Sequence, residues 1–304
     1  MKDLLIGTAE AIRDRLRAAG PAQLSRRVLG VSPGGDAQFD IDAVAEAALW
    51  KYLLANASVP LAVQTEDNHR RDTGDDPRHL LVIDPIDGTR PASAGLEMAM
   101  VSIAVAPLDK PTPTIGDVTH ALLMELASGA WMYAGPETAG VEADGFAAPV
   151  PSLSATVSPR HMFWSLEFNG HPMRLMSDAY AHLVDASANT GGVFVFNSAC
   201  YSISRIVTGQ LDAYVDIGNR ILRDRPETEP EFRRVGGGDV LHLFPYDIAA
   251  AVVLARRAGV VITDAYGEGL DETALLDLSP LNQRSCIAAS TAELHAHLLD
   301  TIRW

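Results

Sequence analysis

The stretch that decides the fold is HLLVIDPIDGT, residues 79–89. Its first half is apolar, as in a buried strand, and a tight turn follows. Asp84 and Asp87 stand three positions apart in that turn, so both carboxylates can converge beside the strand end. Pro85 restricts the backbone, and Gly88 lets a bound group come close to the next peptide N–H groups. Hard oxygen ligands beside an anion-binding turn suit Mg²⁺ and a phosphate group.

Turn formation is the alternative reading of this motif, because Asp, Pro and Gly all favour turns. Two further carboxylates favour metal binding. Glu66 closes the preceding strand, 61–65, from which a neighbouring strand can place it beside Asp84. Asp247 opens a helix behind Pro245, a position where an acidic residue also interacts favourably with the helix dipole. Four carboxylates at the ends of elements predict a site for two or three metal ions.

Length and charge limit the classes of function. At 304 residues the chain exceeds the usual size of a single core, so we expect two closely packed subdomains or one large layered domain. Hydrophobic residues make up 47% and charged residues 21%, the composition of an ordinary globular protein. The formal net charge of −15 argues against binding to nucleic acid or to an anionic membrane. Recruited divalent cations still allow an anionic substrate to bind.

The cysteines and the apolar runs favour the cytoplasm. Cys200 and Cys286 are far apart in apolar surroundings, as expected of buried, reduced thiols. Charged residues from Lys2 to Arg17 interrupt the start of the chain, so it lacks the apolar core of a signal peptide. The longest apolar run, 248–255, is too short to span a membrane.

Helical and strand patterns alternate along the chain and predict α/β layering. An amphipathic helix opens the chain and ends near Gly20, and a second covers 42–54. The expected strands are 61–65, 79–83, 99–106, 162–168 and 193–196, with further strand character over 121–133, and two more helices cover 176–183 and 199–208. The stretch 135–158 is rich in Gly, Pro, Ala and Ser, so it is either a boundary between two halves, 1–145 and 146–304, or a long surface loop.

The sequence resembles the inositol monophosphatase-like family of Mg²⁺-dependent, lithium-sensitive sugar phosphatases. That superfamily also contains fructose-1,6-bisphosphatases and 3′-phosphoadenosine 5′-phosphate phosphatases. The first signature of the family is DPIDGT, here residues 84–89, without a change. Further matches, in the family's order, are NSA at 197–199, GQLDAY at 209–214, DIAA at 247–250 and the segment 258–264, with a weaker acidic match over 36–46.

The resemblance implies an α/β (α+β) fold, the layered αβαβα sandwich, with an α+β N-terminal half, an α/β C-terminal half and the metals between them. It implies two or three Mg²⁺ ions and a homodimer. The implied metal ligands are the side chains of Glu66, Asp84, Asp87 and Asp247 and the carbonyl group of Ile86. Glu66, Thr89 and Asp87 are the implied catalytic residues, of which Thr89 and Glu66 would help to position and deprotonate the attacking water. The implied substrate contacts are Asp87, Gly88, Thr89, Ala199, Asp216 and Asp247.

The implied reaction is Mg²⁺-dependent hydrolysis of a small phosphorylated metabolite, with inositol monophosphate as the leading substrate. Fructose-1,6-bisphosphate and 3′-phosphoadenosine 5′-phosphate are alternatives within the class. A non-catalytic regulatory protein that keeps the fold is the alternative outside it.

Several residues depart from the family pattern. Arg90-Pro91-Ala92 follows Thr89, where an Asn-Phe-like pair is usual, and Asp67 replaces a second Glu. Tyr246 stands for a usual Trp, and Asp216 is one methylene shorter than the usual Glu. The largest departure is the arginine-rich segment 217–246, which is a lid whose arginines meet a second anion, an oligomer contact or a surface loop.

Overall fold

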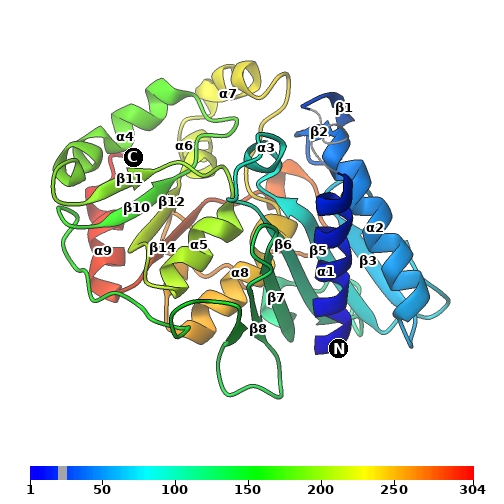
Figure 1. The fold of residues 1–304 in the computed structure, drawn as a ribbon. Coiled ribbons are helices and arrows are strands. Elements are labelled where there is room, and N and C mark those ends of the chain that lie inside the picture. The colour runs from blue at the N-terminus through cyan, green and yellow to red at the C-terminus, as the bar shows by residue number, and fades with distance from the viewer. Residues whose placement is uncertain (20–25) are drawn as a thin grey trace.

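The computed structural model describes residues 1–19 and 26–304 (Figure 1). In this part of the chain the α-helices are α1 (Lys2–Ala19), α2 (Asp40–Asn56), α3 (Thr89–Ser93), α4 (Met173–Ser187), α5 (Ala199–Val207), α6 (Gly218–Asp224), α7 (Glu229–Val235), α8 (Pro245–Ala258) and α9 (Ala292–Thr301). Short 3₁₀ turns are η1 (Ile115–Asp117), η2 (Pro226–Thr228) and η3 (Pro280–Asn282). The predicted end of the first helix near Gly20 lies outside the described residues.

The strands form two large sheets and one hairpin. The seven-stranded sheet has the order β4-β3-β5-β6-β7-β8-β9, and the five-stranded sheet has the order β11-β10-β12-β14-β13. The hairpin consists of β1 (Val28–Val31) and β2 (Ala37–Phe39). The other strands are β3 (Leu61–Thr65), β4 (Arg71–Asp72), β5 (His79–Asp87), β6 (Met100–Pro107), β7 (His120–Glu125), β8 (Trp131–Ala134), β9 (Glu142–Asp144), β10 (Phe163–Leu166), β11 (Gly192–Phe194), β12 (Ala213–Asp216), β13 (Val261–Thr263) and β14 (Cys286–Ala289).

Helices and sheets alternate in five layers. Helices α1 and α2 cover the outer face of the seven-stranded sheet, α5 and α8 lie between the two sheets, and α4 and α9 cover the far face of the five-stranded sheet (Figure 1). The predicted αβαβα sandwich is therefore confirmed. The division at residue 145 stays a prediction, because the central core joins residues from both halves.

Strand β5 shows why the layers form. Its apolar residues alternate between two cores: Leu80 and Val82 face the layer of α5 and α8, whereas Leu81 and Ile83 face α1 and α2. A strand buried on both faces has to be apolar at consecutive positions. The continuous apolar run read from the sequence thus places β5 inside the sheet, with the DPIDGT turn at its end.

Two segments differ from a simple loop. Within 135–158, β9 pairs antiparallel with β8 and extends the edge of the seven-stranded sheet. Segment 217–246 is largely helical, because α6, η2 and α7 follow one another along it. Its Phe232 and Ile221 are buried in the core beside the five-stranded sheet, so this segment is part of the fold.

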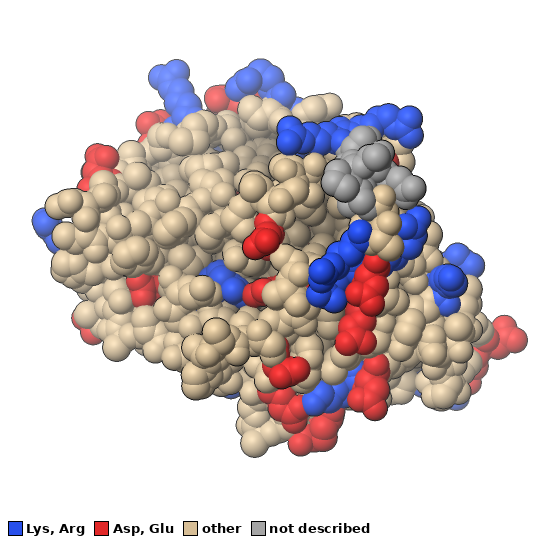
Figure 2. All heavy atoms as spheres, viewed as in Figure 1, with Lys and Arg blue, Asp and Glu red and all other residues tan. Residues whose placement is uncertain are grey.

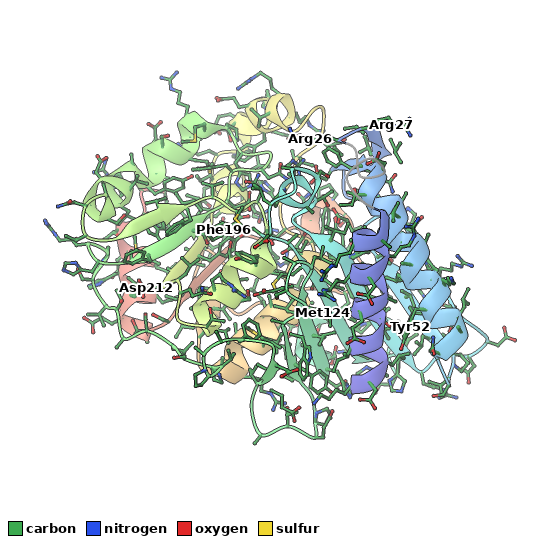
Figure 3. The ribbon with its side chains drawn as sticks, in the orientation of Figure 1. Arg26, Arg27, Tyr52, Met124, Phe196 and Asp212 are labelled. Atoms are coloured by element: carbon green, nitrogen blue, oxygen red, sulfur yellow. The ribbon has the colours of Figure 1, made fainter. Side chains whose placement is uncertain are left out.

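Among residues 1–19 and 26–304, no helix has both the length and the apolar character needed to cross a membrane. Cys200 and Cys286 are both buried and unpaired, as expected. Charges of both signs are interspersed on the face in Figure 2, where Lys and Arg gather near β1 and β2. Arg26 and Arg27, labelled in Figure 3, lie directly before β1 at that end.

Candidate active site

Three carboxylates meet between the sheets. One oxygen each of Asp84, Asp87 and Asp247 lies within 4.8 Å of the others. Asp84 and Asp87 belong to the end of β5, where the pairing with β6 shifts register between them. That irregularity lets both side chains turn toward one point, and the Ile86 amide donates to Asp84 Oδ1 over 2.9 Å. The convergence predicted for the turn is present in the structure.

Asp87 also joins the turn to the C-terminal half of the chain. The Ser198 hydroxyl donates to its carboxylate, as do the backbone amides of Ala199 (3.2 Å), Cys200 (2.7 Å) and Tyr201 (3.3 Å). These amides form the first turn of α5, which has no intrahelical acceptors for them. Asp87 therefore serves as an acceptor at the start of that helix.

An aromatic run holds the chain that leads into α5. The rings of Phe194 and Phe196 stack with centroids 5.7 Å apart, and Phe196 meets Tyr201 edge-on at 5.3 Å. Figure 3 shows Phe196 at the entrance to α5. Asn197 has a φ of 54°, a left-handed conformation that Asn tolerates better than most residues. The predicted motif at 197–199 thus positions the amides that bind Asp87.

Two helices bring acidic residues to the site with the same local geometry. At the start of α8, the Phe244 amide donates to Asp247 Oδ2 over 2.6 Å; at the start of α2, the Phe39 amide donates to Asp42 Oδ2 over 2.7 Å. Each aspartate is the third residue of its helix, where a carboxylate caps free amides. Capping thus fixes the Asp247 side chain in the layer between the sheets and the Asp42 side chain beside the Thr89 hydroxyl.

Thr89 and Gly88 complete the turn. The Thr89 hydroxyl lies 3.1 Å from Asp42 Oδ1 and 3.0 Å from the Ile86 carbonyl oxygen, so it donates its proton in that direction. Gly88 has a φ of 98°, and a Cβ there would lie 2.8 Å from the Met98 carbonyl oxygen. Only glycine fits this position without strain.

Glu66 lies at the end of β3, beside the strand that carries Asp84. Its amide donates to the Ile83 carbonyl oxygen over 3.2 Å, because β3 runs parallel to β5. Glu66 lines the same pocket as the three aspartates, although it is not one of the residues whose oxygens lie within 4.8 Å of one another. The structure thus places Glu66 next to the group, as predicted from the strand ends.

Burial and mutual repulsion make these acids resist ionisation. Removal from water and then the Asp84 charge raise the pKa of Glu66 well above its ordinary value. Burial, followed by the Asp87 charge, does the same for the pKa of Asp84, and burial is the largest cause for Asp247. Burial raises the pKa of Asp87 to about 6, against the lowering effect of its hydrogen bonds. Such a set of carboxylates fits hard divalent cations, which offset both the cost of burying the charges and their mutual repulsion.

The opposite wall of the pocket carries a second group of polar residues. Strands β10 and β12 run parallel and end side by side, so Glu167 and Asp216 emerge together. Burial raises the pKa of each to about 7. Asn169, His171 and His242 line this wall with them. Asp216 was predicted from the sequence, whereas the other four were not.

Arg90 is held at the pocket by an ion pair. Its guanidinium forms two hydrogen bonds, of 2.6 and 3.0 Å, with the carboxylate of Asp36 from the β1–β2 turn. The side-chain amide of Asn169 donates to the same carboxylate over 3.2 Å. These contacts hold the Asp36 pKa below its ordinary value in spite of burial. Arg90, noted from the sequence as a departure from the family pattern, is thus a partly buried arginine whose partner is Asp36.

Of the three alternatives given for segment 217–246, a lid requires arginines that reach the pocket. Arg220 donates to the Ala265 carbonyl oxygen, Arg223 to that of Leu281, and Arg233 to Glu229. None of its five arginines is among the described residues that line the pocket. The segment reaches the pocket instead through 241–244.

The profile of the inositol monophosphatase family matches residues 2–303. The chain belongs to the inositol monophosphatase family. Membership confirms the resemblance read from the DPIDGT turn, and phosphomonoester hydrolysis fits the inositol monophosphatase family.

Known relatives match this chain over nearly their full length. A fructose-1,6-bisphosphatase/inositol-1-monophosphatase from Archaeoglobus fulgidus is 24% identical over 304 residues, covering 99% of both chains. One from Thermococcus kodakarensis is 22% identical over 304 residues, 99% of this chain and 96% of that protein. The structure of the extragenic suppressor protein SuhB from Bartonella henselae has a TM-score of 0.70 at 16% identity, covering 99% and 97% of the two chains. An IMPase from Thermotoga maritima has a TM-score of 0.66 at 17% identity, covering 98% and 95%.

Every residue assigned to the site from the family pattern lines one pocket: Glu66, Asp84, Ile86, Asp87, Gly88, Thr89, Ala199, Asp216 and Asp247. Their roles stay predictions. The pocket residues that were missed are of two kinds. Glu167 directly follows a strand, as Glu66 does, so the same pattern could have found it. His171 and His242 are 71 positions apart and touch through the fold, which no local pattern indicates.

Proposed function

We propose that this protein hydrolyses a small phosphomonoester with the help of divalent metal ions, Mg²⁺ being the expected cation. The observation that carries the proposal is the convergence of Asp84, Asp87 and Asp247 within 4.8 Å in a pocket of an inositol monophosphatase family member. Oxygen-only ligands favour Mg²⁺ over softer metals. Glu66 and the Ile86 carbonyl group are the proposed additional ligands, sufficient for two or three ions.

Bound ions would neutralise charge on the phosphate group and make the attacking water more acidic. The chain itself would orient that water. Because the Thr89 hydroxyl donates toward Asp42, its oxygen is free to accept a hydrogen bond from the water. As the water attacks phosphorus, its proton passes to Thr89 and the Thr89 proton passes to Asp42, while Glu66 helps to position the water. Burial raises the pKa of Asp42 to about 7, which makes it a suitable proton acceptor at neutral pH.

The lining of the pocket favours a polyol monophosphate among the candidate substrates. Arg90 is the one Lys or Arg among the described lining residues, and Asp36 already pairs with it. A bisphosphate or a nucleotide with two phosphate sites would need further positive charge. Asp216 and Glu167 suit hydroxyl groups, which they can accept hydrogen bonds from. Inositol monophosphate is therefore proposed ahead of fructose-1,6-bisphosphate and 3′-phosphoadenosine 5′-phosphate.

A homodimer in the cytoplasm is proposed on the same family grounds and on the reduced cysteines. Light scattering after size exclusion measures the assembly. A mass of one chain across micromolar concentrations would contradict the dimer.

The decisive experiment is a hydrolysis screen with purified protein. The substrates are myo-inositol 1-phosphate, fructose-1,6-bisphosphate, 3′-phosphoadenosine 5′-phosphate and phenyl phosphate, each with Mg²⁺ or with excess chelator. We expect release of phosphate that depends on Mg²⁺ and is fastest with the polyol monophosphate. Folded protein that releases no phosphate from any of these esters would favour the non-catalytic alternative.

A further inference from the structure

A second cavity, separate from the active-site pocket, lies beside α6. Its volume is about 280 Å³, and it is lined by α6, by residues that follow β13 and by the chain between η3 and β14. None of its lining residues lines the active-site pocket. Pockets for drug-sized ligands usually measure about 300–1,000 Å³, so this cavity suits a smaller molecule or ion.

Two guanidinium groups meet in this cavity, that of Arg223 from α6 and that of Arg284 from the chain before β14. Arg223 Nη2 donates to the backbone carbonyl oxygens of Leu281 and Gln283 over 3.0 and 3.3 Å. Arg284 Nη1 donates to the same two oxygens over 3.2 and 3.1 Å. The shared acceptors hold two like charges next to each other, and burial followed by the Arg223 charge lowers the pKa of Arg284.

Neither arginine has an acid as its direct partner. Within residues 1–19 and 26–304, Arg223 and Arg284 form no ion pair, and Asp264 and Asp277 act on Arg284 only from a greater distance. The Nε and Nη1 atoms of Arg223 have no acceptor in that part of the chain. An oxyanion between the two groups would offset their repulsion and accept hydrogen bonds from these free donors.

Asn219 adds a polar side chain that is nearly buried and makes no hydrogen bond to any described residue. It is 5% exposed, and it lines both this cavity and the neighbouring one beside the β1–β2 turn. Its amide is not among the unpaired polar atoms that are sealed from solvent, so the surface that it keeps faces these two cavities. An unpaired amide costs free energy when it is removed from water, and a ligand oxygen that accepts from it gains affinity.

Acidic residues in the same cavity distinguish between oxyanions. Asp264 lines it, and its Oδ1 accepts from the amides of Tyr266 and Glu268 over 2.8 and 2.9 Å. Its Oδ2 has no partner among the described residues, and exposed Glu272 is a second acceptor in the lining. Inorganic phosphate keeps at least one O–H group at neutral pH and can donate it to such an acceptor. Sulfate has no O–H group, and a phosphate monoester has mostly lost its own because its second pKa is about 6.

We propose that this cavity is a binding site for inorganic phosphate. Arg223 and Arg284 bind the phosphate oxygens. The Asn219 amide donates a further hydrogen bond, and the O–H group of the phosphate donates to Asp264. The tetrahedral ion meets donors from several directions at once, which a planar carboxylate with two oxygens does not. Phosphate is a product of the proposed reaction, but its binding in this cavity does not depend on hydrolysis.

Isothermal titration calorimetry with the full chain tests the proposal. The protein is stripped of metal with a chelator and then dialysed, so that phosphate cannot bind at the proposed active site through metal ions. We expect saturable binding of one inorganic phosphate per chain at neutral pH. Sulfate and phenyl phosphate should bind at least about tenfold more weakly, the effect of one hydrogen bond to a charged group.

Two variants and a control assign the binding to this cavity. Arg223→Gln removes an exposed charge, and Asn219→Asp replaces the amide with a carboxylate of the same shape. Each should weaken the binding of phosphate at least about tenfold with an unchanged circular dichroism spectrum. Arg234→Gln, at an exposed arginine of α7 that lines neither cavity nor pocket, is the matched control and should bind phosphate as the wild type does.

Equal affinities for phosphate and sulfate would overturn the proposal, because they would indicate an adventitious ion only. Absence of saturable binding would also overturn it, as would unchanged binding in Arg223→Gln or equal weakening in Arg234→Gln. The hydrolysis screen tests a different property. A protein that binds phosphate without metal but hydrolyses no ester would keep this site and lose the proposed function, and the reverse result would do the opposite.

Discussion

Replacing Asp216 with asparagine should stabilise the protein at alkaline pH. The side chain is 1% exposed, and the Gly218 amide donates to its Oδ1 over 3.2 Å. Burial raises its pKa from 3.8 to about 7, so the folded state favours the protonated acid. A raised carboxyl pKa contributes stability that is present at low pH and is lost as pH rises toward the folded value. Asparagine keeps the shape of the protonated acid and cannot ionise.

The magnitude follows from the two pKa values. Between pH 5 and pH 8 the wild-type protein loses about 2 to 3 kcal/mol of unfolding free energy at this one residue, and Asp216→Asn does not. The variant should therefore gain that much relative to the wild type over the interval. For a chain of this length the change corresponds to about 4 °C in the melting temperature.

Denaturant unfolding at pH 5, 6, 7 and 8, in excess chelator, measures the difference. Asp178→Asn, at an exposed position on α4, is the control for the loss of one carboxylate. A gap that does not change with pH would refute the reasoning. A gap of opposite sign would mean that ionised Asp216 pairs with a protonated His171, 3.9 Å away.

The remaining predictions concern the site and the inserted segment. Asp87→Asn should lower kcat more than tenfold without changing the circular dichroism spectrum. The control is Asp212→Asn, at a buried aspartate outside the pocket (Figure 3), which should keep most of the activity. A smaller loss for Asp87→Asn would contradict its role as a metal ligand. Chelation should abolish hydrolysis, and Ca²⁺ should inhibit the Mg²⁺-loaded enzyme because its coordination is larger and looser; full activity in excess chelator would rule out the metal mechanism. Phe232→Ala should lower the free energy of unfolding, measured in urea, by about 3 to 5 kcal/mol. Phe163→Ala, at an exposed phenylalanine, should lower it by under ~1 kcal/mol. Similar small losses for both would mean that α7 is not part of the core.

The sequence predicted the elements that are strongly patterned. Strand β3 and its position beside β5 followed from two apolar runs that each end in an acidic residue, and the layer of carboxylates followed from those ends. The α8 helix starts at Pro245, close to the predicted start, because proline and Asp247 both favour the first helical turn. The local sequence was sufficient to predict a site residue wherever that residue belongs to a single turn or strand end.

The rest depended on contacts between distant segments. Segment 217–246 gave no clear period, because its helices are short and the residues that anchor it, such as Ile217, Ile221 and Phe232, are irregularly spaced. Its arginines suggested an anion-binding lid, but their partners are carbonyl groups and acids that the fold brings close. Asp36 and Arg90 are 54 positions apart and meet only through the fold. Charge composition alone could not distinguish these uses.

Asp87 has a double attachment with a consequence for how the site loads. Its carboxylate is held by the amides that begin α5, so the helix itself supplies partial positive charge to it. These hydrogen bonds keep the carboxylate in one orientation, so little ordering of this ligand would remain when an ion binds. Loading should then be fast and limited by the ion's loss of its own water, and a change at Ser198 should slow it by letting the carboxylate swing. The amides at the start of α5 therefore preorganise one ligand of the proposed metal site.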